Sequence, residues 1–125
     1  MWVYPLPQGW MAYAGKTDAD NDLLSCSFAR KTDYWFHAHA VPGSHVILRG
    51  PENCAPDRML LELAAGIAAW HSKARHSGSC NVDCTLAVNV SKPPGAPPGT
   101  VSLSRSRLLK VKPGLWVDSA APELF

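Results

Sequence analysis

The chain has 125 residues, of which 46% are hydrophobic and 18% are charged. This length and composition predict one globular domain and exclude an intrinsically disordered chain. The net charge is only +2. The total charge therefore does not indicate a nucleic-acid-binding protein, and only a local concentration of basic residues could attract a polyanion.

The basic residues are unevenly distributed along the sequence. Residues 92–112 contain no acidic residue and five basic ones: Lys92, Arg105, Arg107, Lys110 and Lys112. A second basic cluster, HSKARH, covers residues 71–76. Such clusters can give a nearly neutral protein one basic face.

The sequence also carries signals about location. Residues 1–15 contain no basic cluster and no unbroken apolar run, so a signal peptide is not expected. No segment approaches the roughly 20 apolar residues that span a membrane. We therefore expect a cytoplasmic protein whose four cysteines are reduced thiols.

Proline and glycine divide the first half of the chain into short segments. Apolar and aromatic runs predict four strands, at residues 10–15, 23–29, 34–41 and 44–49. Between the first two, residues 16–22 (KTDADND) are expected to form a polar loop. Pro42 and Gly43 separate the last two strands, because proline removes a hydrogen-bond donor and glycine permits a positive φ.

One long helix is expected, beginning at Pro56 and Asp57 and ending before Gly78. Proline is tolerated in the first turn of a helix, and an acid there favours the positive end of the dipole. Apolar residues recur on one face at helical spacing: Leu60, Leu63, Ala64, Ile67 and Ala68. Lys73 and Arg75 would lie in the last turn. About 20 helical residues would span about 30 Å.

The last third of the chain predicts three strands and a stiff loop. Residues 81–90 alternate apolar and polar side chains, as a half-buried strand does. Residues 91–99 (SKPPGAPPG) form the loop, and residues 100–104 and 108–112 are expected to close a hairpin. The fold class predicted is α+β, with a mostly antiparallel β-sheet packed against one long α-helix.

The segment DYWFHAHAVPGSHV, residues 33–46, holds three of the five histidines. On a strand, His37 and His39 would point to the same face and could share a zinc ion, with His45 or a cysteine as third ligand. The cysteines contain no C-x-x-C pair. A metal site is therefore one hypothesis, although such motifs often arise by chance.

Catalysis and a structural role are the other two hypotheses for this segment. Asp33, His37, Ser44 and His45 combine a carboxylate, two imidazoles and a hydroxyl, but PGSHV lacks the G-x-S-x-G arrangement of a nucleophilic serine. In the structural alternative, Trp35 is buried in the core and the histidines bond to backbone carbonyls. Composition alone favours this alternative about as strongly as all the functional ones together.

Several motifs nevertheless follow one another in a distinctive order: GKTDADND, DYWFHAHAVPGSHVIL, LELAAGIAAWHSKARHS, NVDCTLAVNVSKPPGAPPGTVSL and LLKVKP. In this order they resemble the NFACT-R domain. That family is the C-terminal RNA-binding module of ribosome quality-control factors related to bacterial fibronectin-binding protein A and to the eukaryotic nuclear export mediator factor. The resemblance covers residues 10–113, the expected core of one NFACT-R-like domain spanning residues 1–125.

The resemblance implies a non-catalytic RNA-binding module, with tRNA or rRNA as the partner and no cofactor. Its stand-alone form implies an accessory role in tRNA modification towards 4-thiouridine, alongside a sulfur carrier or an RNA-modifying enzyme. The alternatives are a small metal- or histidine-dependent enzyme acting on nucleic acid, and a protein-docking module. Exposed strand edges could also pair two copies into a homodimer, or the terminal aromatic residues could cover an edge: Trp2, Tyr4, Trp116 and Phe125.

Twelve residues are the expected RNA-binding set: Asn21, Asp22, Asp33, Trp35, His37, Gly43, Ser44, His45, Lys73, Arg75, Lys92 and Gly95. If exposed, Trp35 could stack on a base, and the imidazoles could donate to phosphate or ribose. Gly43 and Ser44 offer backbone amides to an anion. Lys92 would supply a point charge, and Asp33 would orient His37 or bond a backbone amide. We expect these groups to share one solvent-filled cleft.

Overall fold

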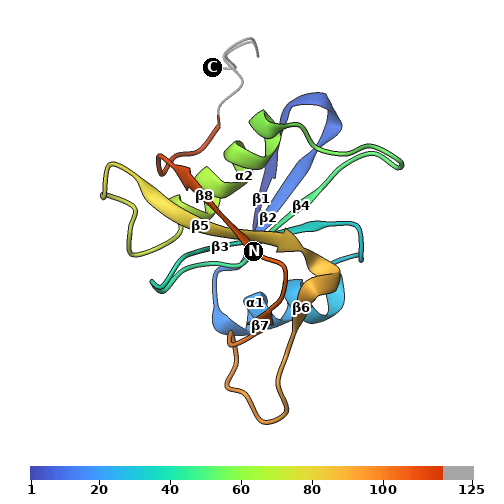
Figure 1. Ribbon diagram of the computed structural model, residues 1–125, viewed down its shortest axis with the longest axis vertical. Helices are drawn as coiled ribbons and strands as arrows, with labels where there is room; N and C mark the ends of the chain where they lie inside the picture. Colours follow the sequence, from blue (N-terminus) through green and yellow to red (C-terminus); the bar gives the residue numbers. More distant parts are fainter. Residues whose placement is uncertain (117–125) are drawn as a thin grey trace, which may run out of the picture.

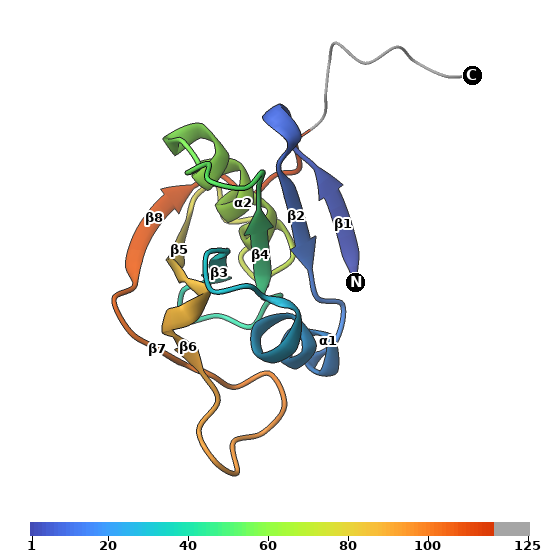
Figure 2. The same cartoon turned by 90° about the vertical axis from the view of Figure 1, so that its right-hand side faces the viewer.

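The structure is a computed structural model that describes residues 1–116. Six strands form one antiparallel sheet in the order β1-β2-β4-β3-β5-β8. They are β1 (Trp2–Pro5), β2 (Met11–Ala14), β3 (Tyr34–Ala38), β4 (Val46–Arg49), β5 (Cys80–Leu86) and β8 (Arg107–Val111). The strands expected at residues 10–15, 34–41 and 44–49 are thereby confirmed as β2, β3 and β4. Figure 2 shows β1 and β8 at the two edges of the sheet.

The helix α2 (Arg58–Trp70) covers one face of the sheet (Figure 1). It begins where expected, because the side chain of Asp57 accepts a hydrogen bond from the amide of Leu60 at 3.0 Å. Its length of 13 residues corrects the prediction of one long helix. The basic cluster that follows is an irregular turn, in which the Ser44 amide bonds to the His71 carbonyl and the Lys73 amide bonds to the Pro42 carbonyl.

A second, short helical segment lies on the opposite face of the sheet, where a loop and a strand were expected. It consists of α1 (Asp18–Leu23) and one turn of π-helix, η2 (Leu24–Phe28). Thr17 starts it by accepting a hydrogen bond from the amide of Asp20 at 3.0 Å. Leu24 and Phe28 then face the sheet at helical spacing, while Leu23 stays exposed. The prediction for residues 16–29 was wrong because the apolar residues there follow the helical and not the strand period.

The C-terminal strands pair differently from the predicted hairpin. β5 ends at Leu86 in a 3-10 turn, and the two-residue strand β6 (Val90–Ser91) follows it. β6 pairs with β7 (Ser102–Leu103) and β8 pairs with β5, so residues 100–104 and 108–112 do not pair with each other. The reversal between β7 and β8 occurs at Arg105, whose φ is +52°.

Two apolar cores result, one on each face of the sheet. The larger core fills the space between the sheet and α2, and it includes Phe36 and Ile67. The smaller core lies between the sheet and η2, and it is formed by Leu24, Trp35 and Ile47. Both faces of β3 are therefore buried, which explains why its sequence shows no clean alternation of polar and apolar residues.

The aromatic residues near the ends of the chain pack inward. Trp2 and Tyr4 contact His71, and Trp116 packs against the larger core. Phe125 lies outside the described residues. Within residues 1–116, no helix has the length and apolar character needed to cross a membrane.

Candidate nucleic-acid interface

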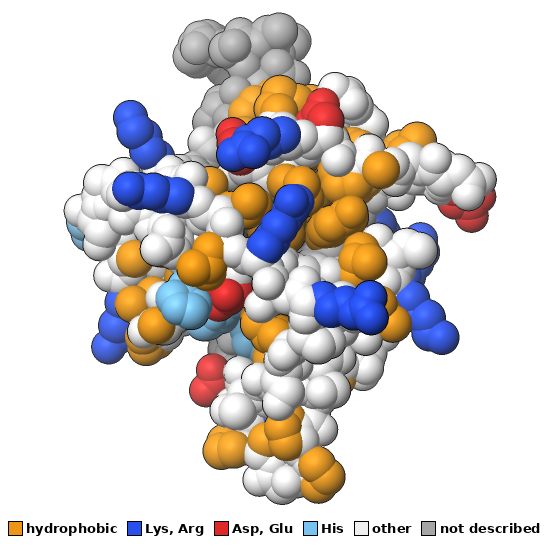
Figure 3. Space-filling view, in the orientation of Figure 1, with side chains coloured by type: hydrophobic (Ala, Val, Ile, Leu, Met, Phe, Trp, Pro, Cys, Tyr) orange, Lys and Arg blue, Asp and Glu red, His pale blue; other side chains and the backbone are white. Residues whose placement is uncertain are grey.

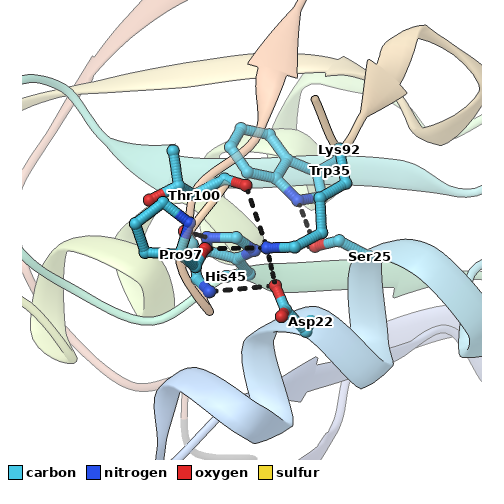
Figure 4. A network of polar contacts seen from close by, with 8 residues as sticks. Asp22, Ser25, Trp35, His45, Lys92, Pro97 and Thr100 are labelled. Carbon is cyan, nitrogen blue, oxygen red and sulfur yellow. Dashed lines mark hydrogen bonds and ion pairs between the residues drawn. The ribbon is translucent and has the colours of Figure 1, made fainter. Parts of the chain in front are cut away.

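A buried chain of hydrogen bonds links Trp35 to residues 91–99, which we call the proline loop (Figure 4). The indole N–H of Trp35 donates to Ser25 Oγ at 2.8 Å, and Ser25 Oγ lies 2.7 Å from Nδ1 of His45. On the other side of its ring, His45 Nε2 lies 3.1 Å from the carbonyl of Gly99. Because a carbonyl only accepts, Nε2 carries the proton and Nδ1 accepts from the Ser25 hydroxyl.

Trp35 and His45 are each only 2% exposed. Burial, together with His37 nearby, lowers the pKa of His45 to about 4, so its ring is neutral at pH 7. The structural alternative therefore describes Trp35 correctly, and the expectation of an exposed stacking surface at this residue is corrected. Nor can His45 donate to phosphate, because both its ring nitrogens already have partners in the protein.

His37 lines a small cleft beside this chain of hydrogen bonds. The cleft has a volume of about 280 Å³, and Asp83 and Thr100 lie in its wall. Burial lowers the pKa of His37, and His39 bonds to Asp83 at 3.0 Å. In Figure 3 a histidine lies directly beside a carboxylate on this side of the molecule. The lowered pKa of His37 and the carboxylate of Asp83 make this cleft a poor site for a polyanion.

Lys92 fastens the proline loop to α1. Its ammonium donates to Asp22 Oδ1 at 3.1 Å and to the carbonyls of Pro97 and Thr100 at 2.7 and 3.3 Å (Figure 4). These bonds use all three N–H donors of a lysine. The Gly99 amide and Lys92 together hold the pKa of Asp22 below its usual range. The free point charge expected at Lys92 is therefore corrected: its protons are engaged inside the protein.

Replacing Lys92 by methionine tests this role. We expect the free energy of unfolding to fall by about 1–2 kcal/mol, because hydrogen bonds to charged groups contribute about 1.5–3 kcal/mol and partial exposure reduces that value. The Gly99 amide, which donates to Asp22 at 2.9 Å, should exchange its hydrogen faster. Lys31→Met, at an exposed lysine, is the control. Unchanged exchange at Gly99 with weakened RNA binding would instead make Lys92 an RNA ligand.

Asp33 orients an arginine and not a histidine. Its carboxylate accepts from Nη2 and Nε of Arg49 at 2.7 and 3.0 Å, and from the backbone amide of Arg30 at 2.8 Å. The Arg49 guanidinium in turn lies 4.2 Å from the ring centroid of Phe28. The expected bond to a backbone amide is present, whereas the expected partner His37 is replaced by Arg49.

The remaining motif residues hold three segments in contact: residues 15–21, residues 43–45 and the turn at Ser72. The side chain of Asn21 accepts from the His45 amide at 3.0 Å, and the hydroxyl of Ser44 donates to the Gly15 carbonyl. A Cβ atom on Gly43 would lie only 2.7 Å from Cβ of Ser72. Only glycine permits this close approach of the two chains. Gly95, by contrast, lies exposed on the proline loop with φ of +75°.

These contacts build the floor of a groove that we call the basic groove. It has a volume of about 380 Å³, and its lining includes Trp2, Gly15, Lys16, Asp18, Gly43, Ser44, His71, Lys73 and Arg75. Lys16, Lys73 and Arg75 are exposed, and Asp18 is the one acidic residue of the lining. The groove therefore carries a net positive charge.

The basic groove contains part of the expected RNA-binding set and excludes the rest. Asn21, Gly43, Ser44, Lys73 and Arg75 line it, whereas Trp35, His37 and His45 line the separate cleft. The prediction of one cleft shared by the histidines, the glycine-serine bend and Lys92 is thereby corrected. Lys16, Trp2 and His71 also line the groove but are not among the predicted RNA-binding residues, although the HSKARH cluster was a signal for this region.

The described histidines, cysteines and acids do not support the metal hypothesis. Within residues 1–116, no three of these side chains are grouped closely enough to hold a metal ion. All four cysteines are free thiols. Burial raises the pKa of both the Cys80 and the Cys84 thiol, which disfavours the thiolate that zinc requires.

Comparisons with known proteins agree with the motifs. The family model described as NFACT protein RNA binding domain matches residues 1–105. The chain is 38% identical over 111 residues to the Rqc2 homolog RqcH of Bacillus subtilis. The aligned region covers 89% of this chain and 19% of that protein. It is 40% identical over 99 residues to RqcH of Streptococcus suis, covering 79% of this chain and 18% of that protein. The chain thus spans about a fifth of the length of these relatives.

A solved structure shares the fold. The C-terminal part of the fibronectin/fibrinogen-binding protein of Streptococcus suis matches with a TM-score of 0.82 and 36% identity, over 90% of this chain and 44% of that one. The resemblance seen in the sequence motifs is therefore confirmed, and the chain belongs to the NFACT RNA-binding domain family.

Proposed function

We propose that this protein binds RNA, without catalysing a reaction, through the basic groove. The observation that carries the proposal is the convergence of Lys16, Lys73 and Arg75 on one groove. The membership of an RNA-binding domain family supports the same function. RNA binding of this kind would take place in the cytoplasm.

The groove suits a phosphate backbone for two physical reasons. Its cations come from two separate segments of the chain, residue 16 and residues 73–75, so an RNA strand in the groove meets positive charge from both. Its floor includes Gly15 and Gly43, where a Cβ atom would clash with Asn21 and Ser72, so these glycines allow the close packing that brings the two cationic segments together. Neutralising phosphates releases condensed counterions, which is the main source of affinity that does not depend on sequence.

The triple variant Lys16→Gln, Lys73→Gln, Arg75→Gln tests the proposal. We expect the affinity for RNA to fall by about one to two orders of magnitude near physiological salt. If each cation neutralises one phosphate of a single strand, the slope of log affinity against log salt should become less steep by about 2, at about 0.7 per contact. Fluorescence anisotropy of a labelled RNA at several salt concentrations measures both quantities.

The matched control is Arg105→Gln, Lys110→Gln, Lys112→Gln, which removes the same charge from exposed positions on and beside β8. In Figure 3 the basic side chains on the face that carries β5 and β8 are scattered, not gathered. We expect this control to change the affinity little. Equal losses in both triple variants would indicate that net charge alone binds the RNA, and a larger loss in the control would move the site to β8.

The choice of RNA and partner forms a narrower part of the proposal. We propose tRNA as the bound RNA, in an accessory role towards 4-thiouridine, as the resemblance to the NFACT-R family implies. We propose that a partner carries the sulfur. Of the four thiols of this chain, Cys80 and Cys84 are buried and have a raised pKa, which disfavours the nucleophilic thiolate, whereas Cys26 and Cys54 are exposed. Crosslinking in cells followed by sequencing separates tRNA from rRNA, and recovery of rRNA would contradict this narrower part.

A further inference from the structure

Trp2 is an aromatic wall of the basic groove. It lies on the edge strand β1, paired with Ala14 of β2, and its indole packs on the side of the sheet that carries α2. Its side chain is partly exposed and lines the groove together with the three cations. Unlike Trp35, it therefore presents ring surface where a ligand can reach it.

His71 holds the indole of Trp2 in place from one side. The two rings are stacked, with centroids 4.0 Å apart and planes 11° apart. His71 is itself fixed, because its amide donates to the Ile67 carbonyl at 3.0 Å, its carbonyl accepts from Ser44 at 2.9 Å, and its Nε2 shares a hydrogen bond with the Tyr4 hydroxyl. Trp2 is therefore a rigid ring surface before any ligand binds.

A cation lies over the same ring. The ammonium of Lys16 is 5.4 Å from the centroid of the Trp2 ring. Lys16 is exposed, and its ammonium has no ion pair among residues 1–116. A cation–π contact at an exposed site is a weak interaction. Lys16 can therefore leave the ring for a phosphate when a flat group takes its place.

We propose that the basic groove accepts an unpaired nucleotide whose base stacks on Trp2 and whose phosphates meet Lys16, Lys73 and Arg75. A base inside a duplex is stacked on both faces and cannot offer one to an indole, whereas an unpaired base can. The protein should therefore prefer single-stranded or looped RNA to a continuous duplex. This inference rests on the proposed function and adds the class of RNA that it selects.

Two variants of Trp2 test the inference against two RNAs of equal length, a single strand of mixed sequence without secondary structure and a fully paired duplex. Stacking of one base is worth about 1–3 kcal/mol, so Trp2→Ala should weaken binding of the single strand by about 5- to 150-fold. Trp2→Phe should keep most of the affinity. Neither variant should alter binding of the duplex or the slope against salt, because neither removes a charge.

Fluorescence gives a second, independent readout. Single-stranded RNA should quench the wild-type protein more than the Trp2→Phe variant, and the difference is the signal of Trp2 itself. Val3→Ala, on the same strand but exposed on the other side, controls for loosening of β1, and thermal melting verifies that each variant is folded.

The outcomes separate this inference from the proposed function. Base stacking on Trp2 would be overturned if Trp2→Ala lost affinity equally for the single strand and the duplex. It would also be overturned if Trp2→Ala lost no affinity and RNA did not quench the fluorescence of Trp2. If in that case the triple variant of the three cations still weakens binding, the groove remains the RNA site. If the triple variant binds like the wild type, the proposed function fails as well.

Discussion

Trp35→Ala is expected to destabilise the protein by about 3–5 kcal/mol, the usual cost of removing a large aromatic side chain from a core. Trp35 is 2% exposed and fills the smaller core together with Leu24 and Ile47. The substitution also removes the hydrogen bond that the indole N–H of Trp35 donates to Ser25 Oγ at 2.8 Å. A domain is typically stable by only about 5–15 kcal/mol, so much of its stability depends on this one residue.

Trp35→Phe separates the two contributions. Phenylalanine keeps most of the apolar contact but cannot donate to Ser25, so we expect a smaller loss of about 1–2 kcal/mol, in the range for one buried hydrogen bond. Urea unfolding of the wild type and both variants measures these differences. A Trp35→Ala variant that keeps its full stability and only loses affinity for RNA would show that Trp35 acts as a base-stacking surface.

The sequence predicted the sheet better than the helices. The strands of residues 34–49 were found because their aromatic and β-branched runs are bounded by Pro42 and Gly43. The helical turn at residues 18–28 was missed because its aspartates resemble a polar loop, and its start depends on the single cap at Thr17. The end of α2 was placed too late because HSKARH suits a helical last turn. In the structure the helix ends at Trp70, where residues 71–73 bond to residues 42–44 and the side chains of Ser72 and Arg75 bond to the carbonyls of Ala69 and Trp70.

The motif residues identified the family but not the site. Trp35, His45, Asp22 and Lys92 have the side-chain chemistry of RNA ligands, yet each is engaged within the protein. Buried polar groups require specific hydrogen-bond partners. The network formed by these four residues therefore needs particular residue types at fixed positions, which is why it can be recognised as a sequence motif. The groove cation Lys16 comes from a segment far from HSKARH in the sequence. Their proximity depends on residues 42–44 pairing with residues 71–73 and on Ser44 and His45 bonding to Gly15.

Acid is expected to destabilise the protein between pH 6.5 and about pH 4, well before most carboxylates are protonated. Burial lowers the pKa values of His45 and His71 to about 4, from an ordinary value of 6.5. Below pH 6.5 the unfolded chain therefore binds protons that the folded protein does not. Each histidine then reduces the stability by up to about 1.4 kcal/mol per pH unit. At pH 5 the two together should cost on the order of 3 kcal/mol.

Urea unfolding at several pH values between 5 and 7.5 measures this dependence. His45→Asn and His71→Asn cannot take up a proton, so each should reduce the slope of stability against pH, whatever its effect on stability at pH 7. Stability that stays constant across this range, or a double variant whose slope is as steep as that of the wild type, would contradict the assignment; a smaller remaining slope is expected, because burial also lowers the pKa of His37. Because the His71 imidazole in its lining is neutral at pH 7, the positive charge of the basic groove comes from lysine and arginine alone. RNA binding to the folded protein near pH 7 should accordingly respond to salt far more than to small changes of pH.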